Sequence, residues 1–413
     1  MEAKFKRLKI ACYTTNITMS VVGNLSPILF LTFHSLYGIS YSLLGLLVLI
    51  NFCTQLGIDL VFSFFSHKFN IPKTVKLTPV IAVVGLLVYA ILPMLFPSYS
   101  YLGIVIGTVI FSAASGLAEV LISPVIAAIP AKDPDREMSK LHSIYAWGVV
   151  GVVVVSTVYL LLVDNTYWYF LALFFALIPL LSALLFAGSE IPKMDTPEKT
   201  TGALHLLKNK GIWLSVFAIF LGGAAECTMA QWASGYLEQS LGIPKVYGDL
   251  FGVAMFAMML GLGRSLYAKI GKNVERVLLL GGIGAAICYG LAAVTPFPIL
   301  GLAACGFAGF CTSMLWPGNL VVASNRFPTG GVFIYALMAA GGDLGASVVP
   351  QAVGIITDLT VSHPEAAAFA ESLSLTPDQL GMKLGMLVGM LFPLIGIPVY
   401  AAILKGKKKY QQQ

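Results

Sequence analysis

The chain has 413 residues, of which 58% are hydrophobic and 11% are charged, and its mean hydropathy is +0.86. Soluble globular domains carry about 25% charged residues, so this composition excludes a soluble domain and predicts a membrane protein. The net charge of +6 comes from basic residues scattered over short loops. Binding to nucleic acid needs a continuous basic patch, so no nucleic-acid partner is expected.

The sequence carries no fingerprint of a cofactor, metal or catalytic site. Its six cysteines lie inside apolar runs without C-x-x-C or metal-ligand spacing, which is typical of small buried hydrophobic residues. Neither a glycine-rich phosphate loop nor a nucleophile elbow occurs. We therefore predict no cofactor, no metal and no enzymatic activity. The first apolar run lacks a small-residue cleavage pattern and is expected to remain as a membrane helix.

Twelve segments are long and apolar enough to cross a bilayer, which takes about 20 mainly apolar residues. They predict an all-α polytopic membrane protein. The predicted spans are residues 9–34, 41–66, 75–95, 100–129, 141–163, 167–188, 211–239, 248–268, 276–294, 298–324, 331–359 and 381–404.

The basic residues predict the orientation of these spans. Loops on the cytoplasmic side of a membrane are enriched in Lys and Arg. With a cytoplasmic N-terminus, and with Arg264 counted in the inner half of its span, 23 of the 25 Lys and Arg residues lie inside, and only Lys245 and Lys383 lie outside. We predict a multi-pass protein of the cell membrane with both termini in the cytoplasm.

The polar stretch 189–210 divides the predicted spans six and six. Weak internal matches support the division, because Ser123-Pro124 in one half corresponds to Trp316-Pro317 in the other. We predict two pseudo-symmetric six-helix bundles at residues 1–188 and 211–413, joined by a cytoplasmic linker at residues 189–210, in a monomer.

Polar residues form a stripe on the span 9–34. Asn16, Ser20 and Gly23 follow at helical spacing on one face, and Asn24 lies beside them. Such a stripe is typical either of polar contacts between helices or of the lining of a solute cavity. Asn16 and Asn24 are candidate solute-binding residues on the second interpretation.

The span 100–129 carries a carboxyl within a stripe of serines. Ser112, Ser115, Glu119 and Ser123 share one face of an otherwise apolar helix. Each hydroxyl both donates and accepts hydrogen bonds, which suits a water-filled passage. We favour a functional stripe, with Glu119 handling a proton and Ser115 binding solute, over a purely structural acid bonded to the hydroxyls.

Glu226 lies near the middle of the span 211–239, where an ionisable group is costly and marks a functional site by default. Small residues such as Gly222 share its face and allow either a close helix contact or room for a solute. In an ideal helix Gln231 and Trp232 point away from Glu226, by roughly 140° and 240°. They join Glu226 in one solute site only if the helix is kinked or unwound there, and we expect a kink.

The span 298–324 places Trp316 and Asn319 on one stripe, with Pro317 between them to bend the helix. An indole beside an amide suits a ring-shaped polar solute. The alternative is an interface anchor, although Trp316 lies well inside its span. Trp168 and Trp213, near the ends of their spans, are typical of such anchors.

Away from their ends, the predicted spans hold four acids, Asp59, Glu119, Glu226 and Asp343, against one base, Arg264. Burial disfavours the charged form of an unpaired carboxyl. Acids without a basic partner should therefore hold protons at rest and exchange them when a cavity opens, which predicts proton coupling. The glycines around Asp343 fit helix packing equally well. Asp59 and Arg264 are expected in gating or structural roles.

Four local motifs resemble a known family. They are Gly-Leu-Ala-Glu119, His142-Ser-Ile-Tyr, Glu226 followed by Trp232, and Gly-Asp343-Leu-Gly. Together with the topology they resemble the fucose-permease-like branch of the major facilitator superfamily, which are sugar:proton symporters. The resemblance implies a solute site near the midplane between two halves and a protonation role for Glu119. That branch also has an acid in its first helix, where this chain has only Asn16 and Asn24.

His142 lies at the cytoplasmic edge of its span, where it belongs either to an inner gate or simply to the surface.

The leading prediction is a proton-coupled secondary transporter that moves a small polar solute, with a sugar favoured, by alternating access. Its partners are the solute, protons and the lipid bilayer. Proton-antiport efflux of a drug or metabolite would use the same acids in the opposite direction. A non-transporting membrane receptor or scaffold is less favoured, because it would not need several intramembrane acids.

Overall fold

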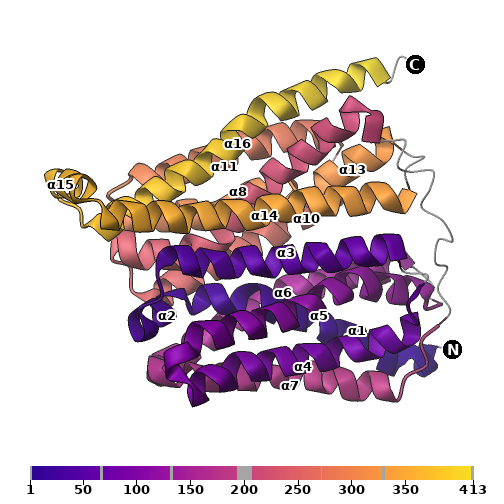
Figure 1. Ribbon diagram of the computed structural model, residues 1–413. Helices are drawn as coiled ribbons and strands as arrows, with labels where there is room; N and C mark the ends of the chain where they lie inside the picture. Colours follow the sequence, from indigo (N-terminus) through magenta and orange to yellow (C-terminus); the bar gives the residue numbers. More distant parts are fainter. Residues whose placement is uncertain are drawn as a thin grey trace. The chain divides into compact units, whose positions relative to one another are not determined.

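The computed structural model describes residues 2–65, 68–130, 134–192, 207–270, 272–327 and 331–410. These residues form helices and connections without a strand (Figure 1). Within them, eleven helices are long and apolar enough to cross a membrane, and the bent pair α1–α2 makes a twelfth span. Apolar runs of this length form helices in hydrocarbon, because a helix satisfies its own backbone hydrogen bonds. The predicted all-α fold with twelve spans is confirmed.

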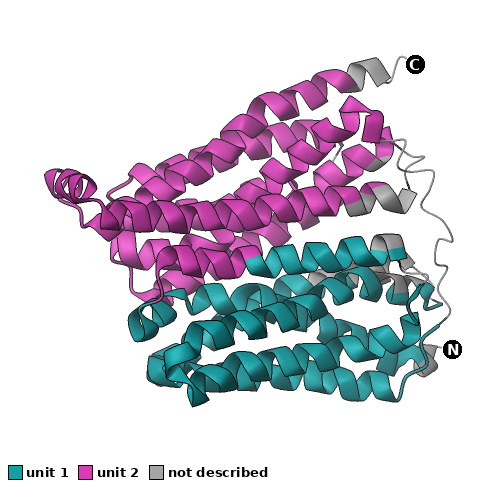
Figure 2. Cartoon of the chain, viewed as in Figure 1, with its two compact units in different colours: residues 1–38, 50–200 teal, residues 39–49, 201–413 magenta. Residues whose placement is uncertain are grey.

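Two compact units make up the chain (Figure 2). One comprises residues 1–38 and 50–200, and the other residues 39–49 and 201–413. Helix α3 therefore contributes its beginning to the second unit and its remainder to the first. Most of the predicted linker, residues 193–206, lies outside the described residues, and the predicted domain boundaries stay a prediction.

The helices of the first unit follow the predicted spans closely. They are α1 (Glu2–Ile28), α2 (Phe30–Tyr37), α3 (Tyr41–Phe65), α4 (Ile71–Leu95), α5 (Ser100–Ala128), α6 (Pro134–Leu162) and α7 (Trp168–Ala187). The first predicted span is bent by 45° between α1 and α2. Pro27 lies just before this bend and lacks the N–H of a regular helical turn.

An aromatic cluster lies in the core of the first unit. The ring centroids of Phe33 and Trp168 are 4.9 Å apart, and those of Tyr89 and Trp168 are 5.5 Å apart. Trp168 is fully buried and donates from Nε1 to the Tyr37 hydroxyl at 3.0 Å. The prediction of an interface anchor is therefore wrong for Trp168, whereas Trp213 is exposed as an anchor requires.

The second unit contains α8 (Lys210–Leu241), α9 (Lys245–Tyr247), a π-helix (Gly248–Ala254), α10 (Met255–Ile270), α11 (Val274–Val294), α12 (Pro298–Thr312), α13 (Pro317–Arg326), α14 (Gly331–Ser362), α15 (Pro364–Ser372) and α16 (Pro377–Tyr410). Side chains that cap helix ends recur here. Asn209 and Asn273 accept from backbone N–H groups at the starts of α8 and α11, and Gly242 takes the left-handed conformation at the end of α8.

Helices α8 and α14 pack with their backbones in contact. A Cβ added at Gly223 would overlap the Gly342 carbonyl, and one added at Gly345 would overlap the Phe220 carbonyl. A Cβ at Gly222 would lie 2.7 Å from the Leu315 carbonyl oxygen. The small residues around Glu226 thus serve close helix approach.

Candidate functional site

Polar side chains join α3 to α5 in the first unit. The Ser112 hydroxyl of α5 donates to Asn51 Oδ1 of α3 at 2.6 Å, and Gln55 Nε2 donates to the same oxygen at 3.1 Å. All three side chains are buried. One turn further along α5, a Cβ at Gly116 would lie 3.1 Å from the Gln55 Cα. The two helices are therefore held together at successive turns.

Asp59 and Glu119 follow one turn beyond these contacts. Asp59 is 6% exposed, and its charge interacts with that of Glu119. The Asp59 Oδ1 atom is buried and has no hydrogen-bond partner within the described structure. The structure thus brings together two acids that the sequence assigned separately to gating and to proton coupling.

Glu119 differs from its neighbours on α5 in being exposed. Ser112 and Ser115 are buried, whereas Glu119 is exposed. Glu119 still lies within the apolar span Pro97–Ile122. A carboxyl at such a depth normally faces the interior of a bundle or a water-filled cavity, because contact with lipid is costly.

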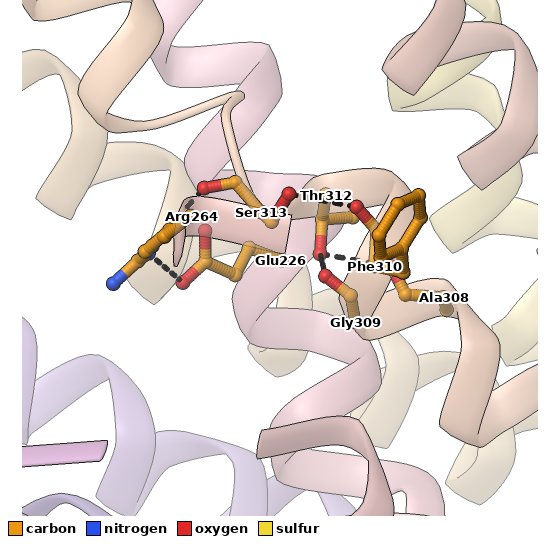
Figure 3. A network of polar contacts seen from close by, with 7 residues as sticks. All are labelled: Glu226, Arg264, Ala308, Gly309, Phe310, Thr312 and Ser313. Atoms are coloured by element: carbon orange, nitrogen blue, oxygen red, sulfur yellow. Dashed lines mark hydrogen bonds and ion pairs between the residues drawn. The ribbon is translucent and has the colours of Figure 1, made fainter. Parts of the chain in front are cut away.

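In the second unit Glu226 forms an ion pair with Arg264 of α10 (Figure 3). Arg264 Nη2 lies 3.0 Å from Glu226 Oε1, and the two side chains are 38% and 14% exposed. The other carboxyl oxygen, Oε2, is buried and has no hydrogen-bond partner among the described residues. Glu226 is therefore not one of the acids without a base.

Arg264 also donates a hydrogen bond to the backbone where the span 298–324 is broken. Its Nε donates to the carbonyl oxygen of Ser313 at 3.0 Å, in the segment 313–316 between α12 and α13 (Figure 3). In a regular helix that carbonyl would accept from the N–H of residue 317, but Pro317 has none. Arg264 thus supplies the donor that the proline removes.

The residues around this break pack against α8. Trp316 is half-buried, and its ring lies over the backbone of Gly223 and Gly342. Asn319 is 1% exposed, and its Nδ2 donates to the Ala218 carbonyl at 3.3 Å and to the Leu315 carbonyl at 2.6 Å. This arrangement favours a packing role for Asn319 over solute binding.

The stripe on α1 faces α6. Asn16 Nδ2 donates to the Leu141 carbonyl at 2.6 Å, and the Ser20 hydroxyl donates to the Tyr145 carbonyl at 2.9 Å. Asn24 is half-buried and donates to the Ser20 carbonyl at 2.8 Å. Of the two interpretations of this stripe, the structure favours polar contacts between helices for Asn16, and Asn24 keeps a partly open position.

Near Glu226 the helix is unbroken, and the kink expected there stays a prediction. Helix α8 is uninterrupted from Lys210 to Leu241, because no proline or missing donor interrupts its hydrogen bonds there. Trp232 is 1% exposed and donates from Nε1 to the Pro350 carbonyl of α14 at 2.9 Å. Gln231 is buried as well. These two residues therefore do not join Glu226 in one site.

Asp343 is 4% exposed on α14. It follows Gly342, whose carbonyl meets Gly223 of α8, three residues before Glu226. The remaining predicted residues are placed only in part. Ser115 lines a small cavity with Thr15, Thr18 and Thr78. His142 lies in α6, and its side chain, like that of Ser123, falls outside the described structure.

Two polar arrangements were not predicted from the sequence. Asp249, fully buried in the π-helix, pairs with Lys245 at 3.3 Å and accepts from the Ser234 hydroxyl. The spacing of Lys245 and Asp249, four residues apart, was the available signal. At the start of α3, the backbone N–H groups of Tyr41 and Ser42 donate to the Asp358 carboxylate of α14 at 3.0 and 2.7 Å. No sequence signal links residues that far apart.

Comparison with known proteins gives a consistent fold. A sequence model of the Major Facilitator Superfamily matches residues 11–350. The chain matches no curated protein. Among solved structures it is similar to the nucleoside transporter NupG, with a TM-score of 0.73 and 12% identity over 96% of this chain and 98% of that one.

Two sugar symporters of known structure are also similar to this chain, at similarly low sequence identity. A D-xylose-proton symporter gives a TM-score of 0.73 at 17% identity, covering 95% of this chain and 97% of that one. The E. coli fucose:proton symporter FucP gives 0.58 at 14% identity, covering 95% and 99%. Identities this low show a shared fold alone, so the resemblance to the fucose-permease-like branch stays a prediction.

Proposed function

The chain belongs to the major facilitator superfamily, and on that premise we propose that it couples the movement of a small polar solute, with a sugar favoured, to protons by alternating access. It is a multi-pass membrane transporter and not an enzyme. We also propose that the protein lies in the cell membrane as a monomer, with both termini in the cytoplasm. Its two six-helix bundles are proposed to be joined at residues 189–210.

The observation that carries the proposal is the exposed carboxyl of Glu119 within an apolar span. An intramembrane acid that reaches water can bind and release a proton, whereas one locked in an ion pair cannot do so without breaking the pair. Glu226 is locked in that way by Arg264. We therefore assign proton coupling to Glu119, and we no longer assign it to Glu226.

The solute side of the proposal rests on the second unit. Arg264 is 38% exposed and uses Nε and Nη2 for Ser313 and Glu226, which leaves further N–H groups of its guanidinium as donors. Trp316 is half-buried in the broken span, three residues after the Ser313 carbonyl that Arg264 binds, and offers an aromatic face. Donors and an aromatic ring from the same segment suit a sugar, whose ring has polar edges and apolar faces. The names of two similar structures, symporters of D-xylose and fucose with protons, agree with this class.

Purified protein in liposomes tests the proposal. An inward proton gradient, acid outside, should drive uptake of a labelled sugar from a panel of neutral monosaccharides, and Glu119→Gln should abolish the response to the gradient while the protein remains folded. Glu226→Gln is the matched control, because it changes a second intramembrane acid that has its own base. Uptake that ignores the gradient, or that Glu119→Gln leaves unchanged, contradicts proton coupling.

The same liposomes separate the alternative. Solute accumulation only under the opposite gradient, with a hydrophobic drug or a metabolite as the preferred solute, would replace symport by proton-antiport efflux. Absence of flux for every solute under both gradients would favour a non-transporting membrane protein.

A further inference from the structure

The helices α3 and α5 keep one register along their contact. Asn51 meets Ser112 through a hydrogen bond of 2.6 Å, and the backbone of Gln55 meets Gly116. Each contact pairs a residue of α3 with one that lies 61 positions later on α5. One helical turn onward the same register pairs Asp59 with Val120, so that Glu119 is the residue next to the paired position. The interaction of the Asp59 and Glu119 charges agrees with this placement.

Gly116 is what allows this register. A Cβ there would lie 3.0 Å from the Ile58 Cβ and 3.1 Å from the Gln55 Cα, closer than ordinary contacts. With glycine at this position, the backbones approach and the side chains on both sides of the contact are forced together. Asp59 and Glu119 each lie about one turn past this closest point of the helix pair.

The surroundings of Asp59 favour sharing a proton over carrying a charge alone. Its Oδ1 is buried with no hydrogen-bond partner in the described part of the chain, and an ionised oxygen in that state is costly. Apolar residues of both helices, Phe62, Leu117 and Leu121, belong to the buried hydrophobic core of the same unit. Two neighbouring carboxylates cannot both ionise cheaply in such a place.

The described basic groups on α1 and α4 are not among the charges that act on Asp59. The described charged groups on α1 and α4, the helices packed on α5, include Lys9, Lys73 and Lys76. Among described residues the charge that acts on Asp59 is that of Glu119. On α6 the side chains of Arg136, Lys140 and His142 lie outside the described residues.

We propose that Asp59 is a positioning residue for the coupled proton: Asp59 and Glu119 hold one proton between them, and the charge of Asp59 sets the pH at which Glu119 exchanges it. Exposed Glu119 takes the proton from water and returns it there. With one proton the pair carries a single negative charge, and losing it would leave two adjacent anions. This inference rests on the proposed proton coupling through Glu119.

Asp59→Asn tests the inference, because it keeps the shape of the side chain and removes its charge. Without that charge, the Glu119 anion is easier to form, so Glu119 gives up its proton at lower pH. The pH midpoint of gradient-driven uptake in liposomes should move toward acid by about one unit or more, a tenfold change in proton concentration. Asp59→Glu, which retains the charge, should restore a midpoint near that of the unaltered protein.

Ser112→Ala is the matched control, since it breaks the neighbouring contact between α3 and α5 without changing a charge. It should leave the pH midpoint in place, and a shift as large as that of Asp59→Asn would assign the effect to packing and overturn the inference. Gel filtration establishes that each variant is folded. If Asp59→Asn does not fold, Asp59→Ser gives a second uncharged side chain for the same measurement.

The two proposals fail in different ways. An unchanged midpoint in Asp59→Asn or Asp59→Ser, with coupling still abolished by Glu119→Gln, overturns the shared proton and leaves proton-coupled transport standing. Uptake that responds to no gradient, in the unaltered protein and in Glu119→Gln alike, refutes the coupling itself.

Discussion

Replacing Arg264 by methionine should destabilise the second unit through two separate losses. Methionine fills much of the space of the arginine stem but has no N–H donor. The substitution leaves Glu226 without its base and leaves the Ser313 carbonyl, which Pro317 cannot satisfy, without a donor. Each loss acts on a different partner, so the two can be measured separately.

The geometry sets the size of each loss. Breaking a buried ion pair costs about 3–5 kcal/mol, and an exposed pair is worth about 0–1 kcal/mol. With side chains 38% and 14% exposed, this pair lies between these limits, and we take about 2 kcal/mol. An unsatisfied buried carbonyl adds about 1–3 kcal/mol. At about 2–4 °C per kcal/mol for a domain of roughly 200 residues, Arg264→Met should lower the Tm by about 10 °C.

Pro317→Ala isolates the carbonyl contribution. Alanine restores the N–H of residue 317, which can then donate to the Ser313 carbonyl. In this background Arg264→Met should lower the Tm by only about 5 °C, because the loss at Glu226 alone remains. Thermal unfolding of the four purified proteins at one scan rate gives the comparison as a double-mutant cycle. An equal drop in both backgrounds would refute the role of Arg264 at the break.

Three further substitutions test other contacts. Gly345→Val should prevent the close approach of α8 and α14 and abolish folded protein on gel filtration, whereas Gly57→Ala, with open space around its Cβ, should be neutral. Asp358→Ala should cost about 1–2 kcal/mol by uncapping α3, measured as a lower Tm, and an unchanged Tm would show that water replaces the cap. Lys245→Gln should cost about 3–5 kcal/mol because it strands the buried Asp249, and the double variant with Asp249→Asn should recover stability if the ion pair is the cause.

The spans and their number could be predicted because hydrocarbon imposes a simple rule. A segment in lipid must satisfy its own backbone, and so the apolar length of the sequence predicts the helix. The same rule predicts a bend where a proline lacks the N–H that a regular helix needs. Pro317 produces a break, whereas the acid Glu226 does not interrupt α8, because a charged side chain leaves the backbone hydrogen bonds intact.

The partners of the candidate site residues could not be predicted. Arg264 stood out in the sequence as the one base away from the ends of the spans, yet nothing in the sequence paired it with Glu226, 38 residues earlier, or with Ser313. Asp59 and Glu119 lie on different helices, and their nearness depends on the register that Gly116 permits. Residue type predicted which side chains matter, while helix packing decided which of them meet.

The glycine contact between α8 and α14 has a consequence for how the chain assembles. In lipid the association of helices depends on close van der Waals packing, since there is no water to expel from between them. This pair has its backbones in direct contact, but α14 begins at Gly331, long after α8 ends at Leu241. During synthesis α8 is therefore inserted in the bilayer well before α14, and its glycines lack their α14 contacts until α14 has been inserted.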